Sequence, residues 1–180
     1  MLEIELKVAV DDLGKVRTRL TEKNAAMIGK VHEHDIYYNA PHRDFGVTDE
    51  ALRVRYTDNR AVVTYKGAKL KKSGLKAREE VNTGIESGAA FETMLDRLGF
   101  IKTAEVNKWR ENYRFHNAMI SLDSVDELGT FVEIEVMTGS ENSDAEDQIE
   151  KISKEIGVHG EPILASYLEL LLSKRSEVQP

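Results

Sequence analysis

The sequence contains no cysteine and only three prolines among its 180 residues. The lack of cysteine excludes disulfides, thiolate metal sites and a cysteine nucleophile, and it fits the reducing cytoplasm, where we expect the protein to act. No apolar run is long enough to span a bilayer, and the charged segment beginning at Glu3 leads us to expect no signal peptide. Positive charge is also scarce, because the formal net charge is −7. We therefore expect neither membrane insertion nor binding to nucleic acid through the overall field.

The length and composition are those of one globular domain. A chain with 41% hydrophobic and 32% charged residues can bury a single sizeable core. We place this domain at residues 1–173. The polar segment 174–180 is expected to be frayed.

The first segment of the chain alternates strictly between two kinds of side chain. Leu2, Ile4, Leu6 and Val8 fall on one face, and Glu3, Glu5 and Lys7 fall on the other. This period of two predicts a strand with its apolar face buried. Paired carboxylates suit Mg²⁺ or Mn²⁺, and a neighbouring lysine suits a phosphate. Taken alone, the charged face is better explained as a solvated strand surface whose alternating charges pair with a neighbour.

The rest of the chain predicts an α+β fold. Helices are expected at about 13–23, 88–98, 144–156 and 162–172, and strands at 2–10, 26–39, 52–56, 62–66, 77–81, 102–115, 118–123 and 131–136. Most connections between consecutive strands are short, which favours antiparallel pairing. Eight antiparallel strands can close into a β-barrel that holds one small ligand. We therefore predict an eight-stranded antiparallel closed barrel with flanking helices.

Most of the strands carry one charged face. The bases on these faces are Lys7, Arg53, Arg55, Lys66, Arg78, Lys108 and Arg110, and the acids are Glu3, Glu5, Glu80, Asp123, Glu133 and Glu135. The acids gather on the first strand and the last two, whereas the bases crowd the strands between. A closed barrel would thus carry a carboxylate end for a divalent metal and a cationic wall for a polyphosphate.

These segments resemble, in order, the motifs of the CYTH or triphosphate tunnel metalloenzyme superfamily. The matching segments are Glu3-x-Glu5-x-Lys7, Asp35-x-Tyr37-Tyr38, Leu52-Arg53-x-Arg55, Thr64-Tyr65-Lys66-Gly67, Arg78-x-Glu80, Lys108-x-Arg110-x-x-Tyr113, Asp123, and Leu128-Gly129-x-Phe131-x-Glu133-x-Glu135. Ser166-Tyr167 near the C-terminus is also similar. Each motif alone is weak, but the ordered set is specific.

The resemblance implies a tunnel that binds a triphosphate together with Mg²⁺ or Mn²⁺. It implies Glu3, Glu5, Asp123, Glu133 and Glu135 as metal ligands. It implies Lys7, Arg53, Arg55, Lys66, Arg78, Lys108 and Arg110 as catalytic phosphate-binding residues, with Glu80 beside the substrate. The motifs are most similar to those of the class IV adenylyl cyclase branch, which forms cyclic AMP and pyrophosphate from ATP.

Other functions share the same motifs. The superfamily also includes thiamine triphosphatases, inorganic triphosphatases and RNA 5′-triphosphatases, so ATP, thiamine triphosphate and tripolyphosphate are all candidate substrates. A noncatalytic polyphosphate or nucleotide sensor is a further alternative, although it would not need five metal carboxylates. A homodimer is compatible with this interpretation. A zinc pair at His32 and His34 and a lysine-rich lid at 67–76 are weaker hypotheses.

Overall fold

The computed structural model describes residues 2–58, 60–72, 75–138 and 144–178, and within them leaves aside the side chains of residues 2–3, 70–77, 138 and 178. Within these ranges the strands are β1 Leu2–Ala9, β2 Ala26–Asn39, β3 Ala51–Thr57, β4 Arg60–Lys66, β5 Leu70–Lys72, β6 Leu75–Arg78, β7 Glu80–Ile85, β8 Ile101–Phe115, β9 Ala118–Val125 and β10 Gly129–Thr138. The helices are α1 Leu13–Glu22, α2 Phe45–Thr48, α3 Gly88–Arg97, α4 Asp144–Ile156 and α5 Tyr167–Val178. In the described part of the chain, no helix is long and apolar enough to cross a membrane.

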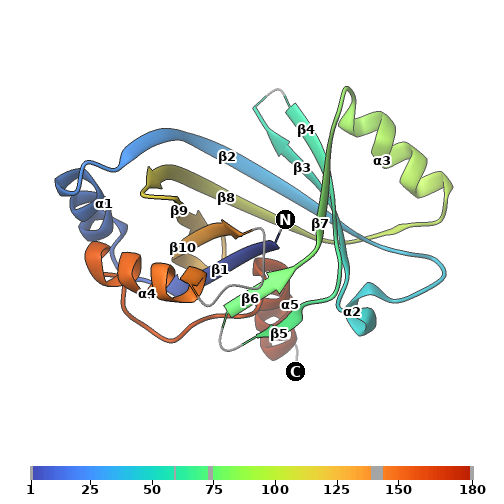
Figure 1. Cartoon of the computed structure of the whole chain (residues 1–180). Helices are drawn as coiled ribbons and strands as arrows, with labels where there is room; N and C mark the ends of the chain where they lie inside the picture. The colour runs from blue at the N-terminus through green and yellow to red at the C-terminus, as the bar shows by residue number, and fades with distance from the viewer. Residues whose placement is uncertain (1, 59, 73–74, 139–143, 179–180) are drawn as a thin grey trace.

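The strands form one curved antiparallel sheet in the order β5-β6-β1-β10-β9-β8-β2-β3-β4-β7 (Figure 1). The antiparallel prediction is correct, but the sheet has ten strands where eight were expected, and its hydrogen-bonded order is open. One additional strand is β5, in a segment where no strand was predicted, and the other arises at Glu79, which divides the strand predicted at 77–81. The half before Glu79 pairs with β1, and the half after it pairs with β4. The chain itself therefore links the two sides of the sheet at this point, without a continuous ladder.

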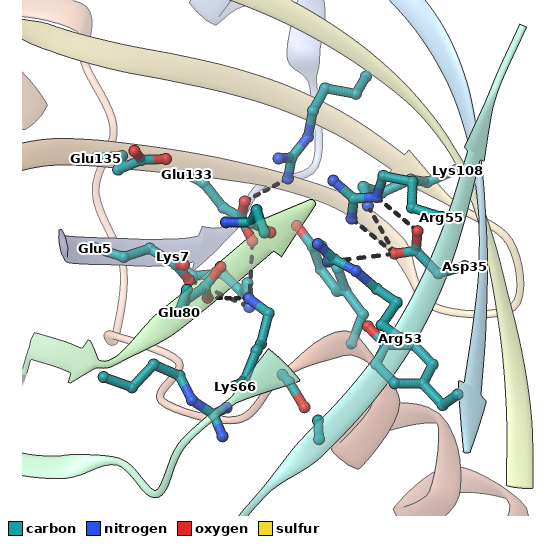
Figure 2. A pocket seen from close by; sticks show the side chains of 17 residues that line it. Glu5, Lys7, Asp35, Arg53, Arg55, Lys66, Glu80, Lys108, Glu133 and Glu135 are labelled. Atoms are coloured by element: carbon teal, nitrogen blue, oxygen red, sulfur yellow. Dashed lines mark hydrogen bonds and ion pairs between the residues drawn. The ribbon is translucent and has the colours of Figure 1, made fainter. Parts of the chain in front are cut away.

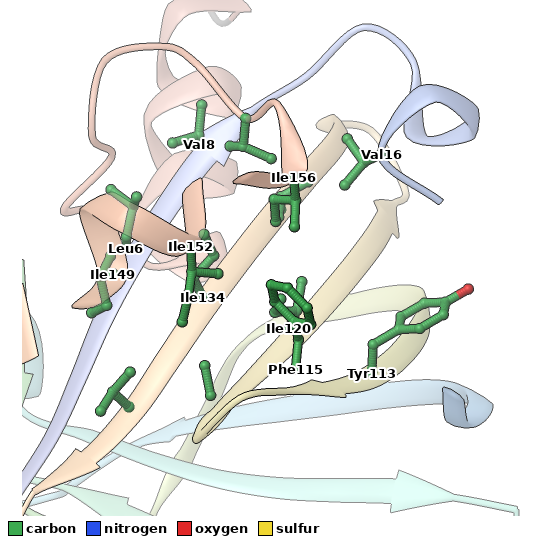
Figure 3. Close-up of a cluster of buried hydrophobic side chains, with 14 of the residues drawn as sticks. Leu6, Val8, Val16, Tyr113, Phe115, Ile120, Ile134, Ile149, Ile152 and Ile156 are labelled. Carbon is green, nitrogen blue, oxygen red and sulfur yellow. The ribbon is translucent and has the colours of Figure 1, made fainter. Parts of the chain in front are cut away.

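The apolar strand faces pack under helices, as the alternation predicts. Leu6 and Val8 of β1 and Ile134 of β10 are buried in one cluster with Ile149 and Ile152 of α4 (Figure 3). Burying an aliphatic side chain of this size contributes about 1.5–3 kcal/mol. This packing fixes which face of each strand is turned away from the helices, and so directs the charged residues to the opposite side.

The C-terminal helix begins and ends later than the sequence predicts. It starts at Tyr167 instead of Pro162, after Ser166, whose backbone N–H donates to Glu169 at its first turn over 2.7 Å. It extends through residues 174–178, in place of the frayed end expected there. Arg175 forms an ion pair of 2.8 Å with Glu127, a contact between distant segments that local sequence does not reveal.

The outer surface of β2 and β8 differs from expectation at Trp109. Trp109 alternates with Lys108 and Arg110, so its ring is expected on the opposite face of the strand, packed under a helix. Instead, 51% of its surface is exposed. Its neighbour is His32, whose ring centroid lies 5.0 Å away.

Candidate active site

A polar cavity of about 260 Å³ lies on the charged side of the sheet. All seven predicted bases line it: Lys7, Arg53, Arg55, Lys66, Arg78, Lys108 and Arg110. Four of the predicted acids, Glu5, Glu80, Glu133 and Glu135, line it as well. In Figure 2 these four carboxylates gather on one side of the cavity and the Arg53, Arg55 and Lys108 side chains on the other, with Lys7 and Lys66 between them. The predicted segregation of acids from bases is thus only partial, because Lys7 and Lys66 pair with carboxylates of the acidic side.

The strand register places opposite charges next to each other. Lys7 of β1 pairs with Glu133 of β10, and Lys66 of β4 pairs with Glu80 of β7. Glu5 instead faces a second carboxylate, because its cross-strand partner is Glu135. Like charges at directly opposed positions are destabilising unless a cation lies between them.

Asp35 organises the basic side of the cavity. Its carboxylate accepts two hydrogen bonds from Arg55, of 2.6 and 2.7 Å, and lies 3.7 Å from Arg53 and 3.5 Å from Lys108. Burial alone would raise the pKa of Asp35, but Arg53, Lys108 and Arg55 together hold it well below its usual range. Asp35 thus stays ionised and holds three cations in fixed positions.

Glu33 supports the same group from the adjacent inward position of β2. It lies 2.6 Å from the Lys108 ammonium and 2.9 Å from the Arg55 guanidinium. Burial raises the pKa of Glu33, but the fields of Lys108 and Arg55 lower it further than burial raises it. Neither Glu33 nor Asp35 was among the predicted site residues, although their alternation with the apolar Ile36 is a signal for an inward face.

A second network holds Arg110. Asp123 accepts from its guanidinium at 2.7 and 2.5 Å, and Glu133 pairs with the same group. The Tyr167 hydroxyl donates to Asp123 over 2.8 Å. Asp123 is fully buried and does not line the cavity. In this arrangement its carboxylate acts on Arg110, which differs from the metal-binding role implied by the resemblance.

Lys7 occupies the centre of the site and is 2% exposed. Its ammonium lies 3.2 Å from Glu133 and 3.5 Å from Glu5, and it donates to the Ala165 carbonyl over 3.2 Å. Burial lowers the pKa of Lys7, but Glu133 and Glu5 outweigh that effect and raise it. Lys7 is thus a permanent cation that lies 4.3 Å above the centre of the Tyr167 ring.

Two buried arginines keep unused capacity for an anion. Arg78 donates to the backbone carbonyls of Gly67 and Asp49, over 2.8 and 2.9 Å, and has no carboxylate partner within the described residues. Arg53 donates to Thr64 over 3.0 Å, while its buried Nε finds no acceptor in the same part of the chain. A buried N–H donor without an acceptor is costly, so Arg53 Nε favours a bound anion. Arg78 favours one through its positive charge, which neutral carbonyls do not offset.

The carboxylates on the acidic side have the chemistry of a hard divalent cation site. Burial raises the pKa of Glu135, and the negative charge of Glu5 raises it further, with smaller contributions from Glu133 and Glu80. A cation among these oxygens would remove that repulsion. Even so, within the described residues no three Asp, Glu or His side chains already converge on one point. The side chain of Glu3 lies outside the described residues.

The other sequence-based hypotheses receive less support. His34 bonds to Glu105 over 2.6 Å and His32 packs against Trp109, so in the described part of the chain the pair belongs to no metal cluster. Lys69 pairs with Asp49 at 3.2 Å, away from the cavity lining. The side chains of Lys71, Lys72 and Lys76 lie outside the described residues.

Six residues that line the cavity were not predicted from the sequence as site residues. They are Asp35, Tyr37, Ala51, Asn82, Ser166 and Tyr167. Tyr37 lies two positions after Asp35, and Asn82 lies two positions after Glu80, so each shares a strand face with a charged lining residue. The alternation could have identified them, but the prediction considered only charged side chains.

The chain is similar to several known proteins along nearly its whole length. The family model of the CYTH domain matches residues 1–167. A Methanocaldococcus jannaschii protein named "Putative adenylate cyclase MJ0240" is 37% identical over 173 residues, which cover 94% of this chain and 98% of that protein. The PH1819 protein of Pyrococcus horikoshii has 38% identity and a TM-score of 0.86, with 96% of this chain and 99% of that one covered.

A more distant structure shares the fold. The Hippeastrum protein HpAC1, whose structure is described as revealing a dominant triphosphatase activity, has a TM-score of 0.72 and 20% identity, with 96% of each chain covered. At this identity the likeness concerns the fold alone.

Proposed function

Because the chain belongs to the CYTH domain family, we propose that it is an enzyme that acts on a triphosphate held in the cavity. One observation carries this proposal: seven basic side chains line a single cavity of about 260 Å³. A linear triphosphate carries several negative charges along a short chain, and a wall of fixed cations matches that distribution.

The chain's own residues bind and orient the phosphates. Arg53, Arg55 and Lys108 are held by Asp35 before the substrate arrives, so little reorganisation accompanies binding. Arg78 contributes a guanidinium without a carboxylate partner in the described residues. These cations stabilise the charge that develops on the leaving phosphate oxygens.

The acidic side would hold the metal. Glu5, Glu133 and Glu135 would be the ligands, with Mg²⁺ or Mn²⁺ as the ion that suits their oxygens. Such an ion neutralises phosphate charge and orients the chain for displacement at phosphorus. Lys7 lies between Glu5 and Glu133 and limits how far these two carboxylates can move.

For the specific reaction, we propose one like that of the class IV adenylyl cyclases. The 3′-oxygen of ATP forms a bond to the α-phosphorus, the bond from that phosphorus to pyrophosphate breaks, and the hydroxyl proton is released. The name given to the Methanocaldococcus jannaschii relative supports this choice. A phosphohydrolase is the second candidate, because the seven bases serve the phosphate chain whatever is attached to it.

The proposal is tested by incubating the purified protein with ATP, thiamine triphosphate or tripolyphosphate, with Mg²⁺ or Mn²⁺. We expect metal-dependent turnover of at least one of them, with products identified by chromatography. The Arg53→Ala variant, prepared identically, controls for contaminating phosphatases and should lose the activity. Tight binding without turnover of any of the three would instead identify a sensor.

A further inference from the structure

Glu33 is a buried carboxylate behind the basic wall of the cavity, and it is not among the described residues that line the cavity. The strand register places it on β2, directly opposite Lys108 of β8. Its Oε2 lies 2.6 Å from the Lys108 ammonium and 2.9 Å from the Arg55 guanidinium. Both of these bases line the cavity. Glu33 therefore acts on a bound ligand through the two bases that it holds.

A second carboxylate, that of Asp35, also lies near Lys108, but it is shared among more groups. Its two oxygens accept hydrogen bonds from Arg55, of 2.6 and 2.7 Å, and it also pairs with Arg53. Its distance to the Lys108 ammonium is 3.5 Å. In Figure 2, Asp35 lies among Arg53, Arg55 and Lys108. Glu33 thus makes the shorter ion pair with Lys108, and its removal disturbs the wall less than removal of Asp35.

The surroundings of Lys108 disfavour its positive charge. The charged and titratable groups that face it come from four elements and are Glu33 and Asp35 of β2, Arg55 of β3, Arg110 of β8 and Tyr167 of α5. Burial lowers the pKa of the ammonium, and Arg55 and Arg110 lower it further, whereas Asp35 and Glu33 oppose these effects. Without Glu33, the balance would move towards the neutral amine.

The charge of Lys108 matters to a polyanion in the cavity. An ammonium attracts phosphate oxygens strongly in a buried site, whereas a neutral amine does not. When the amine is neutral in the empty site, the protein must take up a proton to bind the polyanion, and the affinity then falls as pH rises. The counter-ions present before binding determine the pH at which this fall begins.

We propose that Glu33 is a positioning residue of the triphosphate site, which holds the Lys108 ammonium charged at the cavity wall and so sets the upper pH limit of polyphosphate binding. The inference rests on the proposed function, since the phosphates must occupy the cavity. It gives a carboxylate a favourable part in binding an anion, although its own charge repels that anion.

The test is the calorimetric Kd of tripolyphosphate with Mg²⁺, measured at about pH 7 and about pH 9. The ratio of the two Kd values is compared between the unmodified protein and Glu33→Gln, which keeps the shape of the side chain and removes its charge. One linked proton changes a Kd by up to about tenfold per pH unit, so we expect the ratio to be about tenfold larger in Glu33→Gln. The titration of tripolyphosphate itself is the same for every variant and cancels from the comparison.

Two further variants assign the effect to Lys108. Glu105→Gln makes the same chemical change on β8, at a carboxylate that pairs with Lys102 and His34 and is not among the described lining residues. Its ratio should equal that of the unmodified protein. Lys108→Arg carries a guanidinium that stays charged over this pH range. Adding Glu33→Gln to Lys108→Arg should therefore leave the ratio of Lys108→Arg unchanged.

The outcomes separate this inference from the proposal beneath it. A purely structural contact would weaken binding equally at both pH values, so an unchanged ratio in Glu33→Gln overturns the inference while the triphosphate site stands. A ratio that rises equally in the Lys108→Arg background assigns the proton to another group and also overturns it. If the unmodified protein binds no tripolyphosphate at either pH, the proposed function fails and this inference fails with it.

Circular dichroism shows whether Glu33→Gln keeps its fold. If the fold is lost, Glu33→Asp takes its place, because the shorter side chain keeps the charge but lengthens the contact with Lys108. Its ratio should rise by a smaller factor than that expected for Glu33→Gln. An unchanged ratio in Glu33→Asp would then count against the inference in the same way.

Discussion

The buried hydroxyl of Tyr167 donates to Oδ2 of Asp123 over 2.8 Å, and the same carboxylate holds the Arg110 guanidinium. One helix thereby fixes the position of a base on β8, an element far from it in the sequence. The Tyr167 ring also lies under two ammonium groups, those of Lys7 and Lys108, at 4.3 and 5.6 Å. Tyr167 is therefore placed to position three cations that line the cavity, those of Lys7, Lys108 and Arg110.

Tyr167→Phe tests this positioning role. Loss of one buried hydrogen bond to a carboxylate should lower the free energy of unfolding by about 1–3 kcal/mol. Turnover should also fall, because Arg110 loses its fixed orientation. Tyr113→Phe is the matched control, since its buried hydroxyl contacts Glu111 at 3.4 Å outside the cavity. A loss of stability without any change in KM or kcat for Tyr167→Phe would leave Tyr167 with a purely structural role.

The alternation of the strands made much of this site predictable. Leu6 and Val8 pack under a helix while Lys7 points into the cavity, as a period of two requires. The same rule correctly selected every base that lines the cavity. It could not reveal that Asp35 serves Arg55 and Lys108, because cross-strand register depends on pairing between segments far apart in the chain.

Two further features of the folded chain also depend on tertiary context. The interruption at Glu79 follows from β6 and β7 pairing with different strands, which no local propensity encodes. Asp123 as a metal ligand stays a prediction. The sequence could not show that its carboxylate also bonds to Arg110 and Tyr167, because these contacts join distant segments.

Arg78 should contribute strongly to anion binding. Its partners are the neutral carbonyls of Gly67 and Asp49, and among the described residues no carboxylate pairs with it. Arg78→Ala should therefore raise the Kd of tripolyphosphate by about 30-fold or more, as expected when a buried charge partner is removed. Arg78→Lys should restore only part of the affinity, because the planar fork is lost. Calorimetry measures both effects, and Arg175→Ala, at an exposed ion pair with Glu127, should leave the Kd unchanged. Normal affinity in Arg78→Ala would refute the role.

Glu135 should destabilise the metal-free protein and stabilise the metal-bound form. Burial and the charge of Glu5 raise the pKa of Glu135 in the folded protein above its value in the unfolded chain. The stability that the protonated Glu135 provides is therefore fully present below the pKa of the unfolded chain, and it is lost as pH rises through the pKa of the folded protein. At neutral pH, Glu135→Gln should thus raise the Tm of the metal-free protein by about 2–4 °C per kcal/mol gained. The rise in Tm on adding Mn²⁺ should be smaller in the variant. Thermal scans with Glu150→Gln, at an exposed helical site, provide the control. An undiminished Mn²⁺ shift would exclude Glu135 as a ligand.

Triphosphate binding should be coupled to proton uptake by Lys108. Burial lowers the pKa of this ammonium, and Arg55 lowers it further. The pKa of Lys108 is thus lower in the folded protein than in the unfolded chain. Below the pKa of the folded protein, the charged ammonium lowers the free energy of unfolding, and this loss disappears as pH rises to the pKa of the unfolded chain. A bound polyanion favours the charged form and so raises the pKa again. Calorimetry in alkaline buffers of different ionisation enthalpy should detect the uptake in the unmodified protein and in Lys154→Met, but not in Lys108→Met. Equal uptake in all three would assign the proton elsewhere.

The last prediction separates the cyclase from the phosphohydrolase. A cyclase requires the 3′-hydroxyl of ATP as nucleophile and releases pyrophosphate, whereas a phosphohydrolase uses water and needs no ribose hydroxyl. With Mn²⁺ present, ATP should yield cyclic AMP and pyrophosphate, and 3′-deoxy-ATP should yield neither. Arg110→Ala, measured alongside, should lose the same products if they arise in the cavity. Equal release of orthophosphate from ATP and 3′-deoxy-ATP would make the chain a triphosphatase. In that case the cations around Asp35 would stabilise the charge on a polyphosphate leaving group during attack by water.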